Sequence, residues 1–129
     1  MSDSDEKAWD LFRNIVGIAK GAEEHAAEVE RAACCAVVLE VGDARTAAIA
    51  AMVEHMAAVQ RYANGARTYC QRLRELAESS GDDIHLRNGE SVASRAEKAE
   101  AIAREASEAL VELVNDRPFD NPVCRMTGL

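Results

Sequence analysis

The sequence contains few aromatic residues and prolines, and it has no long run of apolar residues. Aromatic residues make up 4% of the 129 residues, and both prolines, Pro118 and Pro122, lie near the C-terminus. No apolar run is long enough to cross a bilayer, so a membrane-spanning protein is not expected. Strand-like alternation is nearly absent, whereas alanine and long charged residues, which favour helices, are abundant. The composition therefore predicts an all-α protein.

The sequence also lacks an excess of basic residues. It has 23 acidic and 15 basic residues, and the net charge of −8 argues against direct nucleic-acid binding and against attraction to anionic membranes. The charge is uneven, with −6 over residues 1–43, +2 over 44–79 and −4 over 80–129. We therefore expect ion pairs between a mildly basic middle segment and its acidic neighbours. The candidate basic partners are Arg61, Arg67 and Arg72.

The first six residues do not resemble a secretion signal, because they are acidic and polar. This composition leads us to expect a cytoplasmic protein. The four cysteines are then expected to be thiols, since disulfides are rare in that compartment.

Two stretches carry apolar side chains at alternating spacings of three and four residues, which is typical of amphipathic helices that pack along one stripe. The two registers do not join, because the second resumes one position early, at Ile49. The slip falls beside Gly42 and Asp43, where a glycine cap and an aspartate N-cap would form a turn. We therefore predict an antiparallel helical hairpin rather than one unbroken helix. The first register is Ala8, Leu11, Ile15, Ile18, Ala22, His25, Val29, Ala32, Ala36 and Leu39, and the second is Ile49, Met52, Met56, Val59, Ala63, Ala66, Cys70, Leu73 and Ala77.

The pattern predicts a single elongated domain over residues 1–129, an antiparallel bundle of three long helices dominated by the hairpin. The predicted helices cover about 5–41, 43–78 and 90–115, with a linker at 79–90 and an extended tail at 117–129. A break between Gly17 and Gly21 would give four helices instead. Asn64-Gly65 is turn-prone, but the apolar stripe runs through it in phase, so that helix is expected to continue.

The narrow, alanine-rich stripes bury little area, which favours a homodimer in which one hairpin covers its copy. The leading functional hypothesis is a non-catalytic acidic interaction module, an adaptor or inhibitor, with an unknown protein partner. A second is a nucleic-acid mimic that inhibits a nucleic-acid-binding protein. The tail either packs on the bundle or binds a partner through its apolar residues, Phe119, Val123, Met126 and Leu129.

His25 falls on the first apolar stripe, between Glu24 and Glu28. It is interpreted as a helix-face histidine hydrogen-bonded to Glu or to Gln60, with a metal ligand or proton relay as the alternative. A di-iron site requires Glu-x-x-His on two helices, but alanine precedes His25 and methionine precedes His55 at that spacing. No catalytic residue and no required cofactor follow from these positions.

The cysteines show no metal-ligand spacing. The adjacent Cys34 and Cys35 do not easily form a disulfide and are interpreted as packed thiols on an alanine-rich face. Cys70 lies on the second stripe and is expected to be inert, whereas Cys124 in the tail is the expected exposed thiol.

Two pairs of acidic residues form a short pattern, Glu24 with Glu28 and Glu40 with Asp43. They resemble the Glu-Glu-x-x-Glu and Glu-x-x-Asp motifs of the all-α MazG-like nucleotide pyrophosphohydrolases. The sequence departs from that pattern at His25, which stands where the second glutamate belongs, and residues 29–39 contain no turn residue. The resemblance implies Mg²⁺ held by the four carboxylates for hydrolysis of a nucleoside triphosphate.

Overall fold

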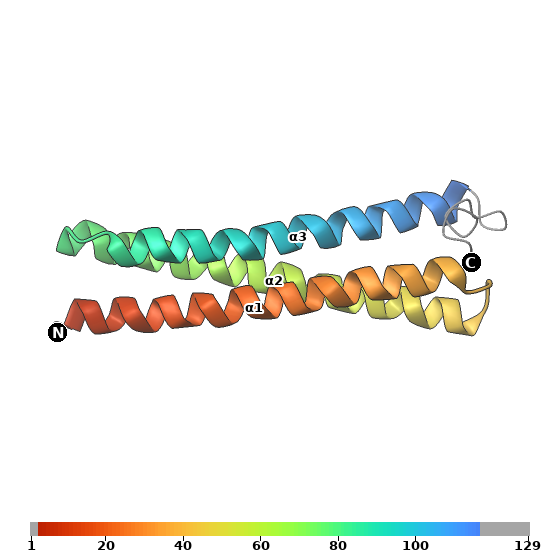
Figure 1. Cartoon of the computed structure of the whole chain (residues 1–129), viewed down its shortest axis with the longest axis horizontal. Helices are drawn as coiled ribbons and strands as arrows, with labels where there is room; N and C mark the ends of the chain where they lie inside the picture. The colour runs from red at the N-terminus through yellow and green to blue at the C-terminus, as the bar shows by residue number, and fades with distance from the viewer. Residues whose placement is uncertain (1–2, 117–129) are drawn as a thin grey trace.

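The computed structural model describes the backbone of residues 3–116 and the side chains of residues 3–112. It consists of three long helices packed side by side, α1 (Asp3–Val38), α2 (Asp43–Ser80) and α3 (Ile84–Asp116), and the described residues contain no strand (Figure 1). At 1.5 Å per residue, α1 is about 54 Å long. The predicted all-α, elongated bundle is therefore confirmed.

The predicted turn beside Gly42 is confirmed, and it begins earlier than expected. The last bond of α1 runs from the Leu39 N–H to the Cys35 carbonyl (3.1 Å), and α1 ends at Val38 rather than residue 41. Gly42 is the N-cap of α2, since its carbonyl accepts the Thr46 N–H (3.0 Å), so the assignment of Asp43 as the cap was one residue late. Valines around the end of α1 have low helix propensity, which is consistent with the early stop.

Both long helices of the hairpin are continuous. The four-helix alternative is wrong, because α1 passes through Gly17 and Gly21 without a break. The α2 helix continues through Asn64 and Gly65, as predicted. A Cβ at position 65 would lie 3.5 Å from the Ile18 side chain, so this glycine occupies an ordinary packed position between α1 and α2.

The predicted linker at 79–90 is wrong, because α2 extends to Ser80 and α3 already begins at Ile84. Gly81 ends α2 with a left-handed φ of 79°, and its N–H donates to the Ala77 carbonyl (2.8 Å). The Asp82 carboxylate then accepts the Ile84 N–H (3.1 Å) at the start of α3. The whole connection therefore takes three residues, and the turn-prone Asn88-Gly89 pair lies inside a helix.

The three helices share one core, because each contacts the other two. Helix α2 runs opposite to α1, while α3 runs parallel to α1. Most buried positions are alanines, and the largest fully buried side chains are Ile15, Leu73, Val29 and Val59. Small side chains allow the helices to approach closely but remove less apolar area from water per turn than leucines would. Among the described residues, no helix is long and apolar enough to cross a membrane.

Candidate functional site

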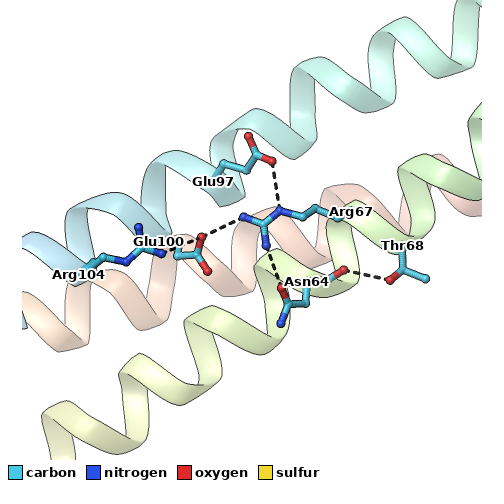
Figure 2. Close-up of polar contacts among 6 residues, drawn as sticks. All are labelled: Asn64, Arg67, Thr68, Glu97, Glu100 and Arg104. Atoms are coloured by element: carbon cyan, nitrogen blue, oxygen red, sulfur yellow. Dashed lines mark hydrogen bonds and ion pairs between the residues drawn. The ribbon is translucent and has the colours of Figure 1, made fainter.

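A polar network joins α2 to α3 near the middle of the rod (Figure 2). Arg67 reaches from α2 and contacts Glu97 (Nε to Oε1, 3.4 Å) and Glu100 (Nη2 to Oε1, 3.0 Å) on α3. Its Nη1 donates to the Asn64 side chain on its own helix (2.8 Å), and Arg104, one turn after Glu100 on α3, contacts the Glu100 carboxylate (3.3 Å). The hydrogen bond that Arg67 donates to Glu100 raises the pKa of the Arg67 guanidinium. The expected pairing of Arg67 with a neighbouring helix is therefore confirmed.

Glu100 is the most deeply placed member of this network. The residue is 8% exposed, whereas Glu97 and both arginines lie at the surface. A carboxylate at this depth requires cationic partners, and two helices supply them: Arg67 on α2 donates a hydrogen bond to Glu100, and Arg104 on α3 forms an ion pair with it. This arrangement is an internal contact between α2 and α3, so the network positions helices and leaves no vacant donor set for a ligand.

Two further ion pairs link the helices in the same region. Arg74 on α2 contacts Glu90 on α3 (3.9 Å), and Arg95 on α3 pairs with Glu23 on α1. The other two arginines that the sequence suggested as ion-pair partners, Arg72 and Arg61, are placed differently. Arg72 stands over the Tyr69 ring (5.1 Å to the centroid), and Arg61 is exposed on α2.

A pair of histidines faces across the α1–α2 contact. The Nδ1 atoms of His25 and His55 are 2.8 Å apart, a hydrogen-bond distance, and both residues are half-buried. The His25 ring also stacks on Tyr62, with centroids 5.6 Å apart and an interplanar angle of 25°. The expectation that His25 hydrogen-bonds to Glu or Gln60 is wrong, because its partner is His55.

Gly21 makes room for this aromatic group. A Cβ at position 21 would lie 2.8 Å from two atoms of the Tyr62 ring, closer than a packed carbon can approach. The glycine therefore lets Tyr62 lie against α1 one turn before His25, where it supports the imidazole. One packed cluster therefore joins Gly21 and His25 of α1 to His55 and Tyr62 of α2. The sequence pattern did not predict this cluster.

The cysteines differ in exposure. Cys34 and Cys35 are both exposed thiols on α1, which corrects their interpretation as packed residues. Cys70 is buried against the core, as expected from its place on the stripe, and burial raises the pKa of its thiol. Cys124 lies outside the described residues. So do the four apolar tail residues assigned to partner binding, Phe119, Val123, Met126 and Leu129.

The structure does not bring the four acidic residues of the pyrophosphohydrolase pattern together. Glu24 and Glu28 lie within α1, and Glu28 pairs with Arg31 on the same helix. Glu40 lies in the turn and Asp43 starts α2, so the ten residues from Glu28 to the end of α1 separate the pairs by about 15 Å. Within residues 3–112, no three His, Cys, Asp or Glu side chains are placed to hold a metal ion.

Large apolar side chains are exposed mainly in the half of the rod that ends at the turn between α1 and α2, residues 39–42. Of the nine exposed among residues 3–112, six lie there, whereas the interhelix ion pairs of Arg67, Arg74 and Arg95 lie toward the other half and the middle. We define the turn-half patch as Val38, Leu39, Val41, Val53, Ile102 and Val111. The remaining three are Trp9, Val16 and Ile84.

Two members of the turn-half patch lie at one level on adjacent helices. The pairing of Arg67 with Glu97 and of Arg74 with Glu90 fixes the antiparallel register between α2 and α3. Continued toward the turn, this register places Val53 opposite Val111, and both side chains are more than half exposed. Two exposed aliphatic groups at one level of the rod place more apolar area at that level than a single exposed residue does.

Comparison with protein-family models, with curated proteins and with solved structures found no match to this chain.

Proposed function

We propose that this protein is a non-catalytic helical interaction module that binds protein partners, a second copy of itself included, through the turn-half patch. The observation that carries the proposal is the uneven surface of the rod. Ion pairs link neighbouring helices toward the middle of the rod and the half farther from the turn, whereas six large aliphatic side chains are exposed over the turn half. Exposed apolar side chains that gather in one part of a surface are typical of protein-binding sites.

The composition of the core supports self-association. Alanines occupy most of the buried positions, so each turn removes a modest apolar area from water. Covering Val53 and Val111 with the same surface of a second copy would bury further apolar area without a new fold. A two-fold axis makes such a surface self-complementary, which is the commonest arrangement in homodimers.

The experiment compares two double variants by sedimentation velocity. Val53→Ser with Val111→Ser removes aliphatic groups from the turn half, and Val16→Ser with Ile84→Ser removes exposed groups of the same kind from the other half. We expect the wild type and the second variant to sediment as dimers at micromolar concentration, and the first variant as a monomer. A monomeric wild type at that concentration would exclude self-association.

The absence of catalysis is tested separately. We expect no release of pyrophosphate when the protein is incubated with nucleoside triphosphates and Mg²⁺. Release that disappears in Glu24→Gln and Glu28→Gln variants would contradict a purely non-catalytic role and restore the hydrolase hypothesis.

A further inference from the structure

We propose that residues 123–129 of one copy bind in a groove between α1 and α2 of a second copy, an exchange that rests on the proposed self-association. The groove lies in the half of the rod farther from the turn, and its volume is about 550 Å³. Binding pockets of proteins usually have volumes of this order. The groove therefore gives the tail of a second copy a place on the rod.

Two leucines and six polar residues line this α1–α2 groove. Leu11 of α1 and Leu76 of α2 are half-buried and pack against the core, whereas all six polar residues are exposed. Arg72 and Glu75, both on α2, are among the exposed ones. The groove therefore combines an apolar wall with charged groups that can orient a bound segment.

Residues 123–129 have the composition that this groove suits. Val123, Met126 and Leu129 are apolar, and the only charged side chain of the segment is Arg125. Aliphatic and thioether groups pack well against leucines, and Glu75 offers a carboxylate to Arg125. A basic segment is also attracted to a protein whose net charge is −8.

The reach of the chain excludes the groove of the same copy for Val123. Val53 and Val111 lie at one level, and Arg72, at the near edge of the groove, lies about 28 Å farther along α2. Asp116 lies about 8 Å beyond Val111 in the opposite direction, toward the turn. Within one chain, the groove therefore begins about 36 Å from Asp116 along the rod. Val123 extends at most about 25 Å from Asp116, so it cannot enter that groove.

A second copy brings the segment within reach. A two-fold axis across the rod, at the level of Val53 and Val111, reverses the direction of its α3. Asp116 of the second copy then lies about 8 Å from the axis on the side of the groove, which leaves about 20 Å along the rod. Val123 spans this distance with enough length left to cross to the next helix. The same symmetry places the tail of the first copy at the groove of the second.

The first test is sedimentation equilibrium of the full chain. Val123→Ser with Met126→Ser should weaken the dimer about tenfold or more, because two apolar side chains lose their binding site. Phe119→Ser is the matched control, because Phe119 extends at most about 11 Å from Asp116 and cannot reach the groove of either copy. This variant should dimerise as the wild type does. Equal weakening by both variants, or by neither, would overturn the proposal.

Disulfide formation between copies tests the position of the tail directly. The background is Cys34→Ser with Cys35→Ser, which removes the exposed thiols of α1. Arg72→Cys then places a thiol in the groove, within reach of Cys124 of the second copy. With oxidised glutathione, a covalent dimer should form about tenfold faster than with Ser91→Cys, because binding in the groove raises the local concentration of Cys124. A non-reducing gel separates this dimer from a disulfide closed within one chain.

Ser91→Cys is the matched control, because Ser91 is exposed at nearly the same level of the rod but on α3, outside the groove. Equal rates for the two cysteine variants, or a disulfide closed within one chain, would overturn the proposal. A dimer that depends on Val53 and Val111 but shows neither the tail effect nor the cross-link would overturn this exchange alone. A monomeric wild type would overturn it together with the proposed self-association.

Discussion

At the scale of single residues, Gly21 determines how closely α1 and α2 can approach around the histidine pair. The Tyr62 ring occupies the space beside Gly21 that a side chain would need. A Cβ added to Gly21 would lie 2.8 Å from the nearest ring atoms. Gly17, one turn earlier in the same helix, has no atom within 4 Å of the corresponding position. Gly21 is therefore required for close packing, whereas Gly17 has space for a side chain.

Substitution of these glycines should change stability in opposite directions. Gly21→Ala is expected to lower the free energy of unfolding by about 1–3 kcal/mol, because the methyl group overpacks the contact with Tyr62. Gly17→Ala should raise it by up to about 1 kcal/mol, because alanine is the better helix former. Urea denaturation followed by circular dichroism measures both. Equal effects of the two substitutions would show that Tyr62 does not pack against Gly21.

The sequence placed His25 on the inner side of the hairpin but could not identify its partner. A pivot at Gly42 puts residues 59–63 at its level, and Tyr62, which does stack on it, lies in that range. The true pivot is closer to Glu40, because α1 ends at Val38, and this brings His55 opposite His25. A shift of a few residues in a helix end thus changes which side chains meet, and apolar periodicity does not fix helix ends to that precision.

At the scale of secondary-structure elements, the contact between α2 and α3 depends on one deeply placed carboxylate. Glu100 receives Arg67 from α2 and Arg104 from α3, and its side chain is 11% exposed. Glu97 also contacts Arg67, but its side chain is 55% exposed, so solvent screens that pair. The two glutamates lie on the same helix and share one arginine, which makes them a matched pair for mutation.

We expect Glu100→Ala to lower the free energy of unfolding by about 1–3 kcal/mol, since Arg104 loses its carboxylate and Arg67 keeps only the exposed contact with Glu97. Glu97→Ala should cost less than about 1 kcal/mol, because surface ion pairs contribute little. The measurement is urea denaturation at low and moderate salt. If the two variants lost the same stability, the depth of Glu100 would have no energetic consequence.

The hairpin and its turn followed from the sequence, whereas the start of α3 did not. The register slip before Ile49 located the turn because helix packing requires a continuous stripe on each arm. Asn88-Gly89 suggested a loop, yet a Cβ at position 89 would lie 2.6 Å from the Leu73 side chain, so that glycine serves a close helix contact. Glycine signals a turn and a close approach equally, and the distinction depends on residues distant in sequence.

At the scale of the whole molecule, the bundle is a rod whose length is set by its helices (Figure 1). Small-angle X-ray scattering of the monomer should give a radius of gyration above the roughly 14 Å of a compact 129-residue domain. Its maximum dimension should exceed about 54 Å, the length of α1. Measurement on the Val53→Ser, Val111→Ser variant, which is expected to be monomeric, separates this shape from self-association. A compact, near-spherical particle would contradict the arrangement of the three helices.

An odd number of helices leaves the rod electrically polar. The dipoles of α1 and α3 point the same way and that of α2 opposes them, so about half an elementary charge of each sign is left at the two tips. Asp3, Asp5 and Glu6 at the start of α1 bring more negative charge than the half-charge of this positive tip, and acidic groups in the first turn stabilise a helix. The backbone dipoles of two such rods lying side by side attract when the rods alternate in direction and repel when their directions coincide.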